Sequence, residues 1–183
     1  MSKWSNIYSQ RLGQGYREYC SIRYKTFIDV LLSKGKFNSF AEEGCGIGTF
    51  SGILFNKFET VIRMTDVDCE MIKLAKSSCL ALSNIIEESD ILTQKYSKNK
   101  RPDIIFSHGV LEHFEDFEIK KIIKRQLRDA NKYVIHYIPT DKWIIPSCGD
   151  ERLLSLDKWQ ELTKFNDFRL FNNCKDAVLV WKV

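Results

Sequence analysis

A glycine-rich segment flanked by acidic residues is the part of this sequence best suited to bind a ligand. It runs Glu42-Glu43-Gly44-Cys45-Gly46-Ile47-Gly48, and glycines so spaced let a backbone turn tightly and approach a bound molecule. Glu42 would repel a pyrophosphate but can pair with the cationic α-amino group of an amino acid. Asp66, 22 residues after Gly44, can accept hydrogen bonds from ribose hydroxyls. These residues favour a nucleoside that carries an amino acid.

A dinucleotide is the main alternative ligand for such a loop. The dinucleotide fingerprint Gly-x-Gly-x-x-Gly requires Gly or Ala three residues after its second glycine, and here that position is Thr49. Together with the carboxylate of Glu42, Thr49 argues against a nucleotide-dependent oxidoreductase.

The elements that must position this loop alternate between strands and helices. Hydrophobic periodicity predicts helices over residues 16–34, 48–56, 68–83, 117–131 and 156–165. It predicts strands over residues 38–42, 60–65, 84–88, 102–107, 133–138, 168–171 and 177–183. Such alternation is typical of an α/β fold with a mostly parallel sheet, and a closing hairpin around Asn172-Asn173 predicts one antiparallel strand near an edge.

Four segments in order carry a resemblance to a known family. They are Phe40–Gly48, Met64–Ala75 (which contains Met-Thr-Asp-Val-Asp), Glu88–Leu92 and Pro102–Phe114 (which ends Leu-Glu-His-Phe). In these segments the chain resembles the class I S-adenosylmethionine-dependent methyltransferases. The resemblance implies a doubly wound sheet of seven strands, helices on both faces, a C-terminal antiparallel hairpin strand, and S-adenosylmethionine as cofactor.

The resemblance also implies which residues form the cofactor site. Those residues are Glu42, Gly44, Cys45, Gly46, Gly48, Asp66, Val67, Asp90, Ile91, Ser107 and His108. The glycine segment would surround the methionine part, and Asp66 would bind the ribose. Val67 and Ile91 would contact the adenine ring, and Asp90 its amino group. Ser107 and His108 would lie near the methyl group.

His108 is the candidate catalytic residue. An imidazole titrates near neutral pH and can remove a proton from a methyl acceptor. The alternative is that His108 only packs against the cofactor or caps the next helix. We expect Glu112 and His113 to be structural. A metal site from His108 and His113 is not expected, because a spacing of five residues places them on different faces of a helix.

Aromatic side chains are the candidates for contact with the methyl acceptor. Tyr8, Tyr16, Tyr19 and Arg23 would form a lid from the N-terminal helical segment 1–36, and Tyr137, Pro139 and Trp143 would line the acceptor side. Packing in the core or on the surface is the alternative for each, and His136 is expected to be a satisfied strand residue. The segment Ser107-His108-Gly109-Val110 replaces the Asn/Asp-Pro-Pro-Tyr/Phe motif, which argues against a DNA-adenine or glutamine methyltransferase.

Charge and size bound the partners. The chain has 183 residues and a net charge of +4, so one domain over 1–183 with a small insertion at 140–156 is expected. Lysine-rich stretches flank the strand at 102–107, but Glu115, Asp116, Glu118 and Asp129 accompany them. A solvated helix face is therefore favoured over a nucleic-acid site. We expect a small-molecule acceptor. A non-catalytic cofactor-binding subunit that supports a partner protein, and an RNA or protein methyltransferase, remain alternatives.

Location and thiol chemistry complete the expectations. The segment Met1–Asn6 lacks the apolar stretch of a secretion signal, and no run of residues is long and apolar enough for a membrane span. A cytoplasmic protein that does not bind a membrane is therefore expected. None of the six cysteines forms a Cys-x-x-Cys pair, so reduced thiols are expected. The oligomeric state and the acceptor atom stay open.

Overall fold

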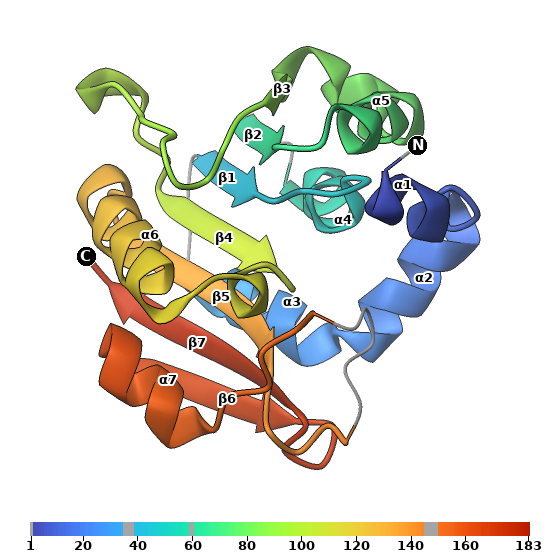
Figure 1. Ribbon diagram of the computed structural model, residues 1–183. Coiled ribbons are helices and arrows are strands. Elements are labelled where there is room, and N and C mark those ends of the chain that lie inside the picture. Colours follow the sequence, from blue (N-terminus) through green and yellow to red (C-terminus); the bar gives the residue numbers. More distant parts are fainter. Residues whose placement is uncertain (1, 35–38, 59–60, 145–149) are drawn as a thin grey trace. The chain divides into compact units, whose positions relative to one another are not determined.

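The computed structural model describes residues 2–34, 39–58, 61–144 and 150–183 (Figure 1). The chain divides into two compact units, Met1–Gln94 and Lys95–Val183, and each is described by itself. The predicted single domain over 1–183 stays a prediction.

The first unit combines helices with three parallel strands. Its helices are α1 (Lys3–Tyr8), α2 (Gln14–Arg23), α3 (Lys25–Ser33), α4 (Thr49–Phe58) and α5 (Cys69–Ser78), with the 3-10 helix η1 (Leu80–Ile85). Its strands are β1 (Ser39–Glu43), β2 (Val61–Asp66) and β3 (Ile86–Glu88). They pair in the order β3-β2-β1, with Glu42 opposite Met64 and Asp66 opposite Glu88. The carboxyl ends of β1 and β2 therefore meet at one edge.

The second unit holds four strands. They are β4 (Ile104–His108), β5 (Tyr133–Pro139), β6 (Asp167–Phe171) and β7 (Asp176–Lys182). Their order is β4-β5-β7-β6; the β4–β5 pair is parallel, and the β5–β7 and β6–β7 pairs are antiparallel. Its helices are α6 (Asp116–Asp129) and α7 (Leu156–Thr163), with the 3-10 helices η2 (Lys98–Lys100) and η3 (Leu111–His113). Within the described residues the chain thus has seven strands, and the predicted α/β fold with a C-terminal antiparallel hairpin is confirmed.

Local signals explain where several elements begin and turn. The Asp68 side chain caps α5 and accepts hydrogen bonds from the backbone N–H groups of Glu70 and Met71, as its position before an apolar periodic segment predicts. A capping box of Glu115 and Glu118 starts α6. The β6–β7 hairpin turns through Asn172, Asn173 and Cys174, which all have positive φ.

The core of each unit consists of large side chains with almost no exposed surface. In the first unit these include Phe27, Leu31, Phe40, Leu54 and Met64. In the second unit they include Ile104, Ile105, Phe106, Leu111, Trp159 and Trp181. The strands β4 and β5 are buried along almost their whole length and are rich in Ile, Val and aromatic residues, as expected for strands covered on both faces.

Two predicted helices differ from the structure. The single helix predicted over 16–34 is two helices, because Tyr24 leaves the helical region at φ −110° and ψ 27°. This break lets α3 bury Phe27, Ile28, Val30 and Leu31, whereas Ile22 on α2 is 80% exposed. The helix predicted over 68–83 ends at Ser78 and continues as η1. The short helix α1 lies within the predicted N-terminal helical segment 1–36, although periodicity predicts a helix only from residue 16 onward.

Three smaller expectations can be compared with the structure. None of the described helices is long and apolar enough to cross a membrane. Cys20, Cys45, Cys69, Cys79 and Cys174 are free cysteines in the structure. The predicted helix end at Gly35 and the middle of the insertion, 145–149, lie outside the described residues.

Candidate cofactor site and active site

The glycine loop follows β1 and is fastened to the end of β2. Gly44, Gly46 and Gly48 all have φ between +53° and +74°, a region that side-chain-bearing residues avoid. The backbone N–H groups of Gly44 and Cys45 both donate to the Thr65 carbonyl at 2.8 Å. The left-handed turns and this shared acceptor hold the loop at the carboxyl ends of the two strands.

Gly48 is required by space as well as by backbone angle. A Cβ at this position would lie 2.4 Å from the Met64 methyl carbon and 3.0 Å from the Cys79 sulfur. The Cys45 thiol is buried and donates to the Gly46 carbonyl at 3.7 Å. Burial raises the pKa of Cys45 well above its usual value, so this thiol stays protonated and acts as a packing group.

Asp66 joins the glycine loop to the end of β2. Its Oδ2 accepts a hydrogen bond from the Gly46 N–H at 2.8 Å, and its Oδ1 accepts one from the Asp68 N–H at 3.0 Å. Burial raises the pKa of Asp66, and these backbone donors partly oppose that shift. Asp66 therefore orders the loop in addition to the ribose contact that the sequence predicts for it.

Glu42 is a buried carboxylic acid at the end of β1. It is 2% exposed, and its Oε2 accepts a hydrogen bond from the Ser51 N–H at 3.0 Å. Burial raises its pKa to about 8, with a further increase from the nearby Asp66 charge. Among the described residues no cation pairs with Glu42, and such a buried carboxyl fits a ligand that brings an ammonium group.

The residues predicted for the adenine differ in exposure. Val67 is 67% exposed directly after β2, which fits an apolar surface that a flat ring can cover. Ile91 is buried. Asp90 starts the turn after β3, and its Oδ1 accepts a hydrogen bond from the Leu92 N–H at 2.8 Å. The structure thus gathers Glu42, the glycines and Asp66, while the adenine contacts stay predictions.

The predicted lid residues form an aromatic cluster around Arg11. The Arg11 guanidinium lies over the rings of Tyr8 and Tyr16, at 5.1 and 5.8 Å from their centroids. Tyr16 and Tyr19 stack with centroids 6.1 Å apart, and burial raises the pKa of Tyr16. Arg23 lies instead over Tyr24, 4.9 Å from the ring centroid. Arg11 was not singled out from the sequence, although its place between Tyr8 and Tyr16 was a usable signal.

In the second unit, His108 ends β4 and stacks on Tyr137 of β5. Their ring centroids are 4.0 Å apart and their planes differ by 6°, as expected for residues paired in register. The next residue, Gly109, has φ +68° and donates its N–H to the Tyr137 carbonyl at 3.2 Å. The imidazole of His108 is thus oriented by its neighbour at the carboxyl end of β4.

Ser107 points away from His108 into the core. Its hydroxyl lies 2.6 Å from Nδ1 of His136, and Nε2 of His136 lies 2.8 Å from Oε1 of Gln126. Because an amide oxygen only accepts, Nε2 carries the proton and Nδ1 accepts from Ser107. Burial lowers the pKa of His136 to about 3. His136 is therefore a satisfied core residue, as expected, and the Ser107 side chain is fully committed to this network.

The sequence did not reveal Asp176, which organises the predicted acceptor side. This buried carboxylate accepts hydrogen bonds from the Tyr137 hydroxyl and the Trp143 indole N–H, both at 2.9 Å. Its other oxygen accepts one from the Asn172 amide at 3.0 Å. Asp176 is the first residue of β7, opposite Pro139. A carboxylate at the start of an apolar strand was the signal available in the sequence.

Glu112 and His113 contact residues 150–152, and their structural role stays a prediction. Glu112 is 3% exposed, its backbone carbonyl accepts from the Arg152 N–H at 2.8 Å, and Nδ1 of His113 lies 3.2 Å from Oδ1 of Asp150. Burial raises the pKa of Glu112 to about 8. Arg152 also donates to the Phe114 carbonyl. These contacts fasten residues 150–152 to η3. Among the described residues, no three His, Cys, Asp or Glu side chains gather as metal ligands.

Comparison with known proteins gives a family match over this region. The family model described as "Methyltransferase domain" matches residues 41–134, more than half of the chain. This range includes the glycine loop, Asp66 and His108. No curated protein is similar enough in sequence to count as a match.

Solved structures match over nearly the whole chain. A protein from Pyrococcus horikoshii has a TM-score of 0.75 at 17% identity, covering 100% of this chain and 99% of its own. Magnesium protoporphyrin IX methyltransferase from Synechocystis, with bound SAH, has a TM-score of 0.73 at 14% identity; the match covers 98% of this chain and 92% of that protein. An S-adenosylmethionine-dependent methyltransferase from Clostridium acetobutylicum has a TM-score of 0.71 at 14% identity; the match covers 90% of this chain and 96% of that protein. Three longer structures match over 49 to 54% of their own length. These likenesses support the α/β fold.

Proposed function

Because the chain belongs to the methyltransferase-domain family, we propose that it transfers the methyl group of S-adenosylmethionine to a small-molecule acceptor. The main observation behind this proposal is that hydrogen bonds hold the glycine loop, Glu42 and Asp66 together at the carboxyl ends of β1 and β2. In open α/β sheets, ligands bind at this edge. The cofactor supplies a methyl group that a sulfonium already activates.

The residues of the first unit fit this cofactor in chemistry. The buried Glu42 carboxyl would bind the amino group of the methionine part, and the turns at Gly44, Gly46 and Gly48 would bring the backbone around that part. Asp66 would hold the ribose, and the exposed Val67 would cover one face of the adenine. Asp90 and Ile91 would complete the adenine contacts.

We assign the general base to His108. Alignment of the acceptor supplies much of the rate of such a displacement, and a base is needed where the acceptor loses a proton. The stack on Tyr137 fixes the imidazole plane of His108. Tyr137 is itself held by Asp176 through its hydroxyl, so the base has an ordered support.

The acceptor is proposed to be small and at least partly aromatic or apolar. Trp143 and Tyr137 lie together because both donate to Asp176. Tyr137 is buried under this contact, and the half-buried ring of Trp143 would face the acceptor. One structural neighbour, the magnesium protoporphyrin IX methyltransferase, is named for a small-molecule acceptor. This supports a small acceptor over RNA or protein.

A transfer assay tests the proposed function. The protein would be incubated with S-[methyl-³H]adenosylmethionine and, separately, with the small-molecule, RNA and protein fractions of a cell extract. We expect label in the small-molecule fraction, and a loss of about 100-fold or more in His108→Ala if His108 is the base. Tyr137→Phe keeps the ring stack and is the matched control, with a much smaller loss. Label only in RNA or protein would contradict the small acceptor.

A further inference from the structure

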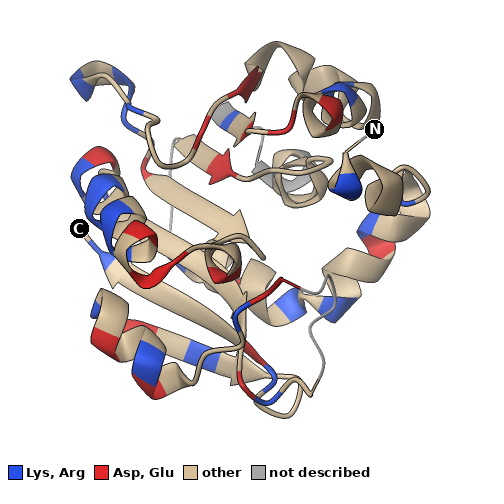
Figure 2. Cartoon of the chain, in the orientation of Figure 1, with Lys and Arg blue, Asp and Glu red and all other residues tan. Residues whose placement is uncertain are grey.

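The net positive charge of this protein lies in one part of the chain. Residues 1–94 contain 11 basic residues (Lys and Arg) and 11 acidic residues (Asp and Glu). Residues 95–183 contain 17 basic and 13 acidic residues. The second unit therefore carries the whole net charge of +4. Figure 2 shows Lys and Arg gathered on α6 and on the loop that precedes β4.

Helix α6 presents its cations on one face. Four outward residues are Lys120, Lys121, Lys124 and Arg128, and they follow the exposed aromatic Phe117 at helical spacing. Phe117 is 70% exposed. The opposite face of the helix is buried through Ile119, Ile122, Ile123 and Gln126.

The acidic residues at the start of α6 form their contacts with groups other than the lysines of this face. Asp116 binds the Arg152 guanidinium, and its other oxygen lies 3.4 Å from Lys158 Nζ. Glu118 accepts a hydrogen bond from the Glu115 N–H at 3.0 Å, within the capping box. These carboxylates are therefore used by residues 150–158 and by the helix end.

The acidic residue at the end of α6 is used in the same way. Asp129 is buried, accepts a hydrogen bond from Arg128 Nε at 2.8 Å, and lies 3.9 Å from Arg125. Three lysines are thus exposed and have no ion-pair or hydrogen-bond partner among the described residues: Lys120, Lys121 and Lys124. Acidic residues are neighbours of these lysines in the sequence, but in the structure their carboxylates contact other groups.

The loop before β4 extends the basic face. Lys95, Lys98 and Lys100 are exposed and likewise have no partner within the described ranges. The residue that follows the end of α6 by two positions, Asn131, donates its side-chain amide to the Arg101 carbonyl and its N–H to the Pro102 carbonyl, both at 2.9 Å. The loop and the helix end are thereby joined. We call the six lysines of the loop and α6 the basic face.

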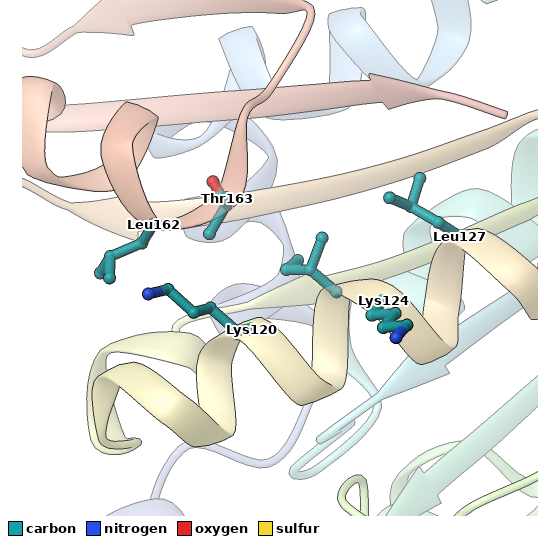
Figure 3. Close-up of a pocket in the computed structure, with 6 residues that line it drawn as sticks. Lys120, Lys124, Leu127, Leu162 and Thr163 are labelled. Carbon is teal, nitrogen blue, oxygen red and sulfur yellow. The ribbon is translucent and has the colours of Figure 1, made fainter.

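A shallow pocket borders the basic face between α6 and α7. It has a volume of about 240 Å³ and is lined by Lys120, Ile123, Lys124, Leu127, Leu162 and Thr163 (Figure 3). An apolar hollow next to free ammonium groups suits a ligand that carries both anionic and flat apolar parts.

We propose that the basic face binds a single-stranded nucleic acid. Lysines one helical turn apart, about 5.4 Å along the axis, form a track for a chain of repeated negative charges, and phosphate neutralisation by lysine supplies most of such affinity. Phe117 offers a stacking surface for an unpaired base, which is typical of single-strand binding. An acidic protein would use the lysines but would gain nothing specific from base stacking. The basic face contains none of the residues assigned to the cofactor site.

Fluorescence anisotropy with a 5′-fluorescein oligouridine of 20 nucleotides tests the proposal. The variant K120Q/K121Q/K124Q should bind at least about tenfold more weakly at 0.1 M salt, and the slope of log K against log salt should flatten by about 2. Phe117→Ala should weaken binding by about tenfold. Circular dichroism checks that the variants fold.

The control variant removes the same charge elsewhere. In K73Q/K76Q/K182Q, three exposed lysines outside the basic face are replaced, and affinity and slope should stay close to those of the unchanged protein. Equal effects of the two triple variants would overturn the proposal, because net charge alone would then explain binding. Tighter binding of polyglutamate than of oligouridine would also overturn it, in favour of an acidic protein partner.

Discussion

Buried carboxylic acids distinguish this protein at the scale of single residues. Glu42 and Glu112 each have a pKa raised to about 8 by burial, so in the ligand-free folded protein both carboxyls hold their proton well above the pH at which an exposed glutamate ionises. An unfolded chain ionises the same groups near their usual pKa of about 4.3. Folding therefore takes up protons between these pH values, and stability must fall as the pH rises.

Glu112→Gln isolates this effect. Between pH 5 and pH 8 the native state keeps a proton on Glu112 that the unfolded state has lost, so the unfolding free energy falls by up to about 1.4 kcal/mol per pH unit from this group. The variant lacks this loss, and its stability relative to the unchanged protein should rise with pH across this window. Urea unfolding at pH 5, 6.5 and 8 measures it. The exposed Glu88→Gln variant is the control, and a pH-independent difference for Glu112→Gln would contradict the account.

Asp176 is the residue on which the acceptor side depends. Replacing it with Ala leaves the donors of Tyr137, Trp143 and Asn172 without their acceptor, and each such loss costs about 1–3 kcal/mol. We expect a total loss of about 3 kcal/mol or more in thermal or urea unfolding. Asp176→Asn keeps one acceptor oxygen and should lose less. Equal stability of all three proteins would show that the network contributes nothing.

The part of the site that is formed by residues close together in the sequence was predictable. Glu42, the glycines and Asp66 lie within one strand–loop–helix–strand unit, so their spacing along the chain also fixes their spacing in space. Asp176 and Tyr137 are 39 residues apart and meet only through the antiparallel pairing of β5 and β7. No local pattern carries that register. The side-chain direction of Ser107, into the core beside His136, was likewise beyond the sequence.

At the scale of elements, the glycine loop can form only because its glycines carry no side chain. Gly48 lies against Met64 and Cys79 at distances that exclude a Cβ. Gly15 in α2 has open space around it. Packing and backbone angle therefore require glycine at position 48, whereas position 15 can also accept a residue with a side chain.

Gly48→Ala should destabilise the protein and weaken cofactor binding together. Overpacking and a positive φ together cost about 1–3 kcal/mol or more, and the shift of Met64 or of the loop displaces the site. Gly15→Ala should be neutral or slightly stabilising, because Ala favours a helix. Differential scanning fluorimetry with and without S-adenosylmethionine measures both effects. Similar melting temperatures for the two variants would contradict the packing argument.

Element types followed from periodicity, whereas boundaries depended on tertiary packing. The strands β1, β2 and β4 and the N-cap of α5 at Asp68 agree with prediction. The break at Tyr24 carries no glycine or proline, and it lets α3 bury its apolar face. Such a break is decided by contacts that a single window of sequence does not contain.

At the scale of the whole molecule, the fold is retained with little sequence identity. The chain matches solved structures at TM-scores of 0.71 to 0.75 with 14 to 17% identity. Fold class is set by the alternation of strands and helices, which many sequences satisfy. The acceptor depends on a few side chains outside that alternation, so it needs a direct test.

Isothermal titration of the purified protein with S-adenosylmethionine tests the central claim most directly. We expect one site per chain, with a dissociation constant in the micromolar range that is typical of enzyme ligands. Asp66→Asn should weaken binding at least about tenfold, whereas Asp68→Asn, which changes only the cap of α5, should bind nearly as well as the unchanged protein. No binding by the folded protein, or equal affinity of Asp66→Asn, would contradict the account.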